Sequence, residues 1–101
     1  MKTTAPVTAD SILARHAADI AFVAEEKPAT TLEDFISQLQ TASHNLGYFA
    51  GINGAEDLDG AATILTAAID ATGTDRDVLV RRAAVYLANT ADMVDEYRLM
   101  V

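Results

Sequence analysis

The predicted fold depends on residues 32–58, which read LEDFISQLQTASHNLGYFAGINGAEDL. Apolar residues recur there at alternating spacings of three and four, which is typical of one face of an amphipathic helix. They are Leu32, Phe35, Leu39, Ala42, Leu46 and Phe49. At about 100° per residue, His44 lies roughly 140° around the helix from Leu39. It shares this outer face with Ser37, Gln40, Tyr48 and Gly51. We therefore predict a helix that continues to about Ile52 and carries an imidazole on its water-facing side.

A spaced motif of histidine, leucine, alanine and glycine begins at His44. Its members are His44, Leu46, Ala50, Gly51 and Gly54, followed by Leu58 and Leu65. The motif resembles that of the histidine-containing phosphotransfer (HPt) domain of two-component relays, whose pattern is H-x-L-K-G-x-A-G-x-x-G. The resemblance implies that His44 takes a phosphoryl group from a phospho-aspartate on a response-regulator receiver domain, or from a histidine kinase, and passes it on. Imidazole is a competent nucleophile near neutral pH.

The same resemblance implies the surroundings of the site. An HPt domain binds no ATP of its own and the magnesium belongs to the receiver, so no cofactor and no metal are expected in this chain. Ser37 and Gln40, two turns and one turn before His44, are expected to hydrogen-bond the ring or the phosphoryl oxygens. The partner is expected to dock over the surface around His44, which completes the predicted partner-binding set of Ser37, Gln40, Gly47, Tyr48 and Gly51.

Two positions depart from the family pattern. Gly47 stands where the family has a lysine, whose cation would offset the charge of a phosphoryl group. Tyr48 stands where the family has a glycine, and a helical side chain four residues after His44 covers the turn that holds it. Two alternatives therefore stay open: a degenerate HPt-like domain that binds receivers or kinases without transfer, and a surface histidine with no chemical role.

Length and composition restrict the classes of protein to consider. The chain has 101 residues, which predicts one helical domain over residues 1–101. It has no cysteine, so disulfides and thiolate metal sites are excluded. Fifteen acidic and seven basic residues give a net charge of −8, which argues against direct nucleic-acid binding. The start of the chain shows no secretory signal and no long apolar run appears, so we expect a soluble cytoplasmic protein without a membrane span.

Residues 1–7 read as a disordered lead, and a first helix is predicted from an N-cap at Thr8 to about Lys27. Its inner stripe is predicted to contain Leu13, Ala17, Ile20 and Ala24, with His16 and Val23 at one edge. Phe22 lies nearly opposite that stripe, as an exposed aromatic. Pro28 stops the helix, and either Thr30 or Thr31 has the spacing to cap the next one.

Two further helices are predicted after the Asn53-Gly54 turn signal. The first covers 55–72, with Gly73 at its C-terminal cap. Its predicted inner residues are Leu58, Ala61, Ala62, Leu65, Ala68 and Ile69. The second begins after a cap at Thr74 and continues to Val101. Its predicted inner residues are Val80, Ala83, Leu87, Ala91, Val94 and Val101. The sequence therefore predicts an all-α fold, a four-helix up-and-down antiparallel bundle.

Other kinds of site find little support in the sequence. The acids before Gly60 do not fit a calcium loop, because positions one and twelve would be Ala55 and Thr66. Nucleotide-binding and serine-nucleophile motifs are absent, which argues against a self-contained enzyme. The remaining alternative is an acidic helical protein–protein interaction protein, such as a nucleic-acid-mimicking inhibitor of the phage anti-defence type.

Overall fold

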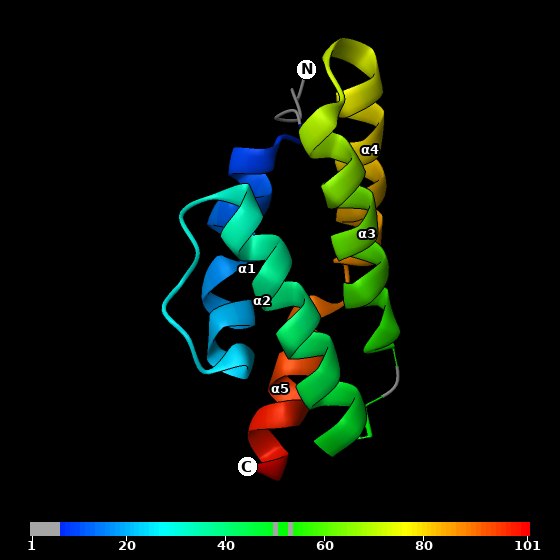
Figure 1. Ribbon diagram of the computed structural model, residues 1–101. Helices are drawn as coiled ribbons and strands as arrows, with labels where there is room; N and C mark the ends of the chain where they lie inside the picture. The colour runs from blue at the N-terminus through cyan, green and yellow to red at the C-terminus, as the bar shows by residue number, and fades with distance from the viewer. Residues whose placement is uncertain (1–6, 50, 53) are drawn as a thin grey trace, which may run out of the picture.

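The computed structural model describes residues 7–49, 51–52 and 54–101, with the backbone alone for Tyr48 and Phe49. These residues form helices and contain no strand, so the all-α prediction is confirmed (Figure 1). The elements are α1 (Ala9–Ala24), α2 (Leu32–His44), the π-helix η1 (Asn45–Phe49), α3 (Glu56–Asp70), α4 (Gly73–Tyr86) and α5 (Thr90–Met100). The first six residues of the predicted disordered lead lie outside the described residues.

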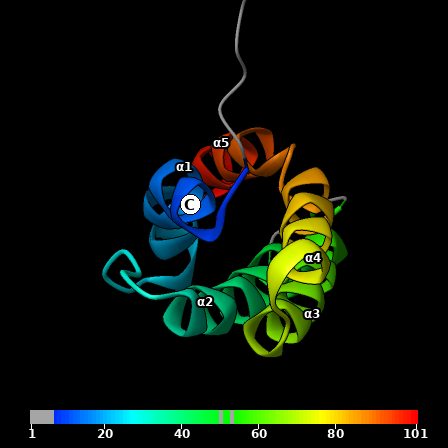
Figure 2. The same ribbon diagram turned by 90° about the horizontal axis from the view of Figure 1, so that it is seen from above.

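Helices α2, α3 and α4 pack in sequence, each antiparallel to the one before it. The hydroxyl of Ser43 at the end of α2 donates to the carbonyl of Ala55 just before α3. Helices α3 and α4 also contact each other away from their connecting turn, where the ring of Tyr86 near the end of α4 lies against Gly60 near the start of α3. Seen from above, α1, α2, the α3–α4 pair and α5 form a ring (Figure 2).

The connection between α1 and α2 differs from a simple hairpin. The side-chain amide of Asn45, just after α2, donates to the carbonyl of Val23 near the end of α1, at 2.8 Å. The C-terminal ends of α1 and α2 therefore lie together and the two helices run in the same direction (Figure 1). Residues 25–31 carry the chain from the end of α1 back to the start of α2. Within this connection, the carbonyl of Lys27 accepts a hydrogen bond from Nε2 of Gln38. Helices α2, α3 and α4 therefore follow the predicted up-and-down order, whereas α1 lies beside α2 and runs parallel to it.

Side-chain caps start the first two helices where threonines were predicted to do so. The Thr8 hydroxyl accepts from the backbone N–H of Ser11, and the Ser11 hydroxyl accepts from the N–H of Thr8. Thr31, of the two possible caps, accepts from the N–H of Asp34. The end of the first helix was predicted too late, because it stops at Ala24. Glu25 adopts a left-handed conformation (φ 59°), and this ends the helix before Pro28 is reached.

The helix that carries His44 changes its hydrogen-bonding pattern earlier than predicted. The α-helix ends at His44 and a π-helix continues to Phe49, so the uninterrupted helix to Ile52 was wrong. Gly51 has a φ of 63°, which ends the helical run because only glycine adopts this conformation at little cost. Leu46 stays fully buried, as predicted, whereas the side chain of Phe49 lies outside the described residues.

The α3–α4 connection is tighter than predicted. Gly73 is the first residue of α4 and Thr72 its N-cap, so the predicted caps at Gly73 and Thr74 were wrong. The φ of 58° at Gly73 lets the chain reverse within two residues after Ala71. This hairpin extends beyond the ends of α1 and α2, which explains why Ile69, predicted to be buried, is 38% exposed (Figure 1).

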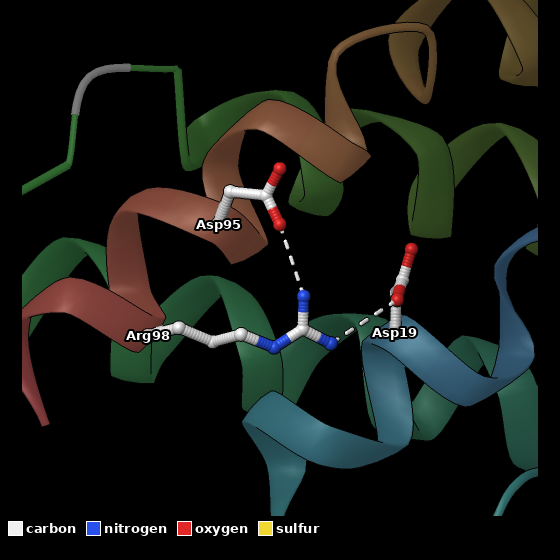
Figure 3. A network of polar contacts seen from close by, with 3 residues as sticks. All are labelled: Asp19, Asp95 and Arg98. Atoms are coloured by element: carbon white, nitrogen blue, oxygen red, sulfur yellow. Dashed lines mark hydrogen bonds and ion pairs between the residues drawn. The ribbon is translucent and has the colours of Figure 1, made fainter.

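The predicted last helix is divided in two. The N–H groups of Leu87 and Ala88 donate to carbonyls three residues back, which tightens and ends α4. The break lets α5 leave α4 and pack against α1, where Arg98 lies between Asp19 and Asp95 (Figure 3). It also rotates the buried face of α5, on which Thr90, Met93 and Val94 lie. Ala91 and Val101, predicted on that face, are exposed.

The core is made of the predicted apolar stripes of α2 and α3 together with inward-facing residues of α1, α4 and α5 and of the break after α4. Its large side chains with no exposed surface include Phe35, Ile20, Leu39, Leu46, Leu58, Leu65 and Leu87. Burying a leucine or phenylalanine of this kind contributes roughly 1.5–3 kcal/mol. Among the described residues, no helix is both long and apolar enough to cross a membrane.

Candidate functional site

His44 is the last residue of α2 and is exposed, as the helical pattern predicted. Both of its neighbours in the chain are tied to other helices. Ser43 is 7% exposed and its hydroxyl donates to the carbonyl of Ala55 at 2.9 Å. Asn45 donates to the carbonyl of Val23 at 2.8 Å, on the α1 side. His44 is therefore an outward-facing residue on a backbone that is held from both sides.

The backbone at His44 is also where the helix changes type. The N–H of Asn45 donates to the carbonyls of Thr41 and Ala42, and the π-helix starts at that residue. Short π-helical segments within α-helices occur frequently at functional sites, because they redirect the side chains that follow them. The geometry after His44 therefore differs from the regular helix on which the expected positions of Gly47, Tyr48 and Gly51 were based.

Ser37 and Gln40 lie on the exposed side of α2, as predicted. The hydroxyl of Thr41 donates to the backbone carbonyl of Ser37, one turn earlier on the same helix. Gln38, between them, points inward and is 4% exposed. Ser37, Gln40 and His44 thus share one exposed helix face.

Gly47 and Gly51 lie beside a separate hollow of about 600 Å³. Its other lining residues are Ser43, Ile52, Gly54, Ala55, Glu56 and Asp59. Ser37, Gln40 and His44 do not line this hollow. The predicted site is therefore divided: the polar face of α2 carries the imidazole, and the glycines border a hollow at the start of α3 whose charged lining residues are both acidic.

The position of the family's lysine can accept a side chain. A Cβ atom on Gly47 would meet Cβ of Ala55 at 3.6 Å, an ordinary van der Waals contact. The absence of a cation at this position is therefore a property of the sequence and not a steric requirement of the fold. The side chain of Tyr48, predicted to lie partly over His44, is outside the described residues.

No metal centre is found in the part of the chain that the structure describes, where no three His, Asp or Glu side chains form a group able to hold an ion. His16 lies where the sequence placed it, at the edge of the core, and is 9% exposed. Burial lowers the pKa of His16, and the positive charge of Arg15 lowers it further, against a weaker opposite effect of Asp19.

Sequence reasoning missed the two residues that hold His44 in place. Ser43 and Asn45 are polar residues next to the histidine, and the available signal was that Ser43 lies beside the apolar stripe, where a hydroxyl needs a partner. Comparisons of the chain with models of known protein families, with curated proteins and with solved structures found no match.

Proposed function

We propose that this chain is an HPt-like domain in which His44 accepts a phosphoryl group from a receiver domain or a histidine kinase. The observation that carries the proposal is an exposed imidazole whose two neighbouring residues are hydrogen-bonded to Ala55 and Val23. A phosphoryl acceptor must be open to its partner and must keep its position as the partner docks, and such positioning comes from supporting hydrogen bonds.

The proposed reaction is a direct transfer. A ring nitrogen of His44 attacks the phosphorus of the partner's aspartyl phosphate, forming an N–P bond as the P–O bond to the aspartate breaks and its carboxylate leaves. The partner supplies the magnesium, and this chain supplies the nucleophile and the docking face. Ser37 and Gln40 lie on the exposed face of the same helix, where their side chains can contact the phosphoryl oxygens or the partner.

The degenerate HPt-like alternative, which binds partners without accepting phosphate, is supported by the acidic residues of the hollow beside Gly47. Among the described residues, the acidic Glu56 and Asp59 line the hollow beside Gly47 and no cation does. Negative groups near a phosphoryl acceptor oppose transfer, since they repel the incoming phosphate. A domain of this kind would bind receivers or kinases and leave His44 unmodified.

The deciding experiment is phosphotransfer from a panel of phosphorylated receivers and kinases to the wild type and to His44→Gln. The proposal expects an acid-labile label on the wild type and none on the variant, with both equally helical by circular dichroism. Binding of the panel without any label would support the degenerate form. Neither label nor binding would overturn the proposal and favour the acidic interaction protein, whose basic partner should dissociate as salt rises.

A second variant tests the role of the missing cation. Gly47→Lys adds the family's lysine at a position with room for its Cβ. We expect faster transfer to His44, because the long lysine side chain extends from the separate hollow toward the phosphoryl group and offsets its charge; an unchanged rate would show that the division of the site keeps position 47 out of reach. Thr63→Lys, which adds the same charge to an exposed position of α3, is the matched control and should leave the rate unchanged.

A further inference from the structure

A second hollow, away from His44, lies between α1 and the end of α4. Its volume is about 320 Å³, at the lower end of the range for small-molecule sites. It is lined by Val7, Ser11, Ile12, Arg15, His16, Ala84 and Ala88. The hollow arises because α4 packs on α3 while α5 packs on α1. The first half of α1 and the end of α4 therefore face each other across it.

The wall of this hollow combines apolar and positively charged groups. Val7, Ile12, Ala84 and Ala88 form an apolar surface, and Arg15 is the one side chain with a permanent charge among the described residues that line the hollow. Both ion pairs among the described residues are made by Arg98, which leaves Arg15 without a carboxylate partner there. The hydroxyl of Ser11 is already used in the cap, where it accepts from the N–H of Thr8 and donates to the carbonyl of Thr8.

His16 lines the same hollow, and its ring makes no hydrogen bond to any other described residue. It is 9% exposed. The side chain is largely buried, but its ring nitrogens are not among the fully buried, unpartnered atoms of the described residues, which are Gln38 Oε1 and Thr90 Oγ1. The imidazole therefore offers a donor and an acceptor to a molecule in the hollow.

We propose that this hollow binds a small monocarboxylate with an apolar body. The carboxylate pairs with the guanidinium of Arg15 and accepts a hydrogen bond from the ring of His16. The apolar body packs on Ile12, Ala84 and Ala88. The single positive charge selects an anion, and a planar carboxylate matches the donors of a guanidinium. This site is independent of the phosphotransfer proposed for His44.

Binding should also change the protonation of His16. Burial and Arg15 lower the pKa of this imidazole, Asp19 on the same helix raises it, and the residues facing it from the α4 side, Ala84 and Ala88, carry no charge. A carboxylate placed beside the ring would raise the pKa of His16, because it stabilises the imidazolium. Affinity for the carboxylate should therefore increase as the pH falls.

The test uses the full chain and three probes of one shape: benzoate, benzamide and benzylamine. Chemical shifts of the lining residues and of the His16 ring are followed by NMR at millimolar probe. Benzoate should shift both, and the pKa of His16 should rise on binding. Equal binding of benzamide or benzylamine, or no shift with any probe, would overturn the proposal.

Two variants locate the site and one serves as control. Arg15→Gln should weaken benzoate binding about tenfold, the usual value of a charge-assisted pair. Ala88→Leu, at an exposed position on the rim, should fill the hollow and abolish binding while the fold is kept. Arg81→Gln removes a similar charge from α4 outside the lining and should change nothing. Unchanged binding in both site variants would show that benzoate binds elsewhere.

Discussion

At the scale of single residues, buried polar groups differ in whether they have partners. Ser43 and Asn45 each reach a backbone carbonyl of a neighbouring helix. The hydroxyl of Thr90 is fully buried and has no hydrogen-bond partner. The first two residues fix the position of His44, whereas Thr90 carries an uncompensated desolvation penalty.

Thr90→Val should therefore stabilise the protein. Valine has nearly the same shape and lacks the hydroxyl, so the free energy of unfolding should rise by about 1 kcal/mol. Chemical denaturation monitored by circular dichroism measures the change. Thr63→Val is the control, since the exposed Thr63 hydroxyl donates to the carbonyl of Asp59. A loss of stability in Thr90→Val would show that the buried hydroxyl has a partner.

A second prediction at the scale of single residues concerns Gly60. A Cβ here would lie 2.7 Å from the ring of Tyr86, so Gly60→Ala pushes that ring out of place. Alanine otherwise favours a helix interior over glycine by about 1 kcal/mol. We expect little gain from Gly60→Ala in the wild type and about 1 kcal/mol of stabilisation in a Tyr86→Ala background. Equal effects in both backgrounds, measured by thermal or chemical unfolding, would exclude the contact.

At the scale of elements, the sequence predicted which segments are helical better than where they end. Spacings of three and four placed Leu39, Leu46 and Leu58 in the core, because the apolar faces of helices must be buried wherever the chain leads them. The left-handed Glu25 and the break at Leu87 depend on packing with distant residues, which local patterns do not contain. The same holds for the site: exposure of His44 followed from periodicity, but its anchoring to Val23 and Ala55 is tertiary.

Helix α5 is attached to α1 by a small cluster centred on Arg98. Its guanidinium lies 3.0 Å from Asp95 and 3.7 Å from Asp19 (Figure 3), and 4.9 Å from the centre of the Phe22 ring. The ring of Tyr97 meets Phe22 edge to face, with centroids 6.1 Å apart. The exposed aromatic of the sequence thus contacts a charged and an aromatic side chain of α5.

Arg98→Ala should loosen α5 without unfolding the rest. Exposed ion pairs contribute little and an exposed cation–π contact about 0.5–1 kcal/mol, so the loss should be about 1 kcal/mol. Amide hydrogen exchange should become faster in α5 while α2 and α3 keep their protection. Arg98→Lys should recover part of the effect, because lysine keeps the charge and loses the planar stacking. Uniformly faster exchange would contradict this local role.

At the scale of the whole molecule, stability should depend on the protonation of His16. Its pKa is lowered in the folded state from the ordinary histidine value of 6.5, so the unfolded chain takes up a proton first as the pH falls. The free energy of unfolding should therefore decrease as the pH falls through the ordinary histidine pKa of about 6.5. His16→Leu should flatten this dependence when unfolding by denaturant is measured across the pH range. An unchanged slope in His16→Leu would assign the effect to other groups.

The connection of residues 25–31 has a consequence for how the length of this chain can vary. Surface loops usually tolerate insertions and deletions. Here seven residues carry the chain back along α2, whose thirteen residues rise about 20 Å. The seven residues join Ala24 to Leu32 by eight Cα–Cα steps, which span at most about 29 Å, and five residues would span at most about 22 Å. A deletion of two residues would leave the loop almost fully extended and unable to curve around α2, since the axes of packed helices are also about 8–10 Å apart, whereas added residues would be accommodated.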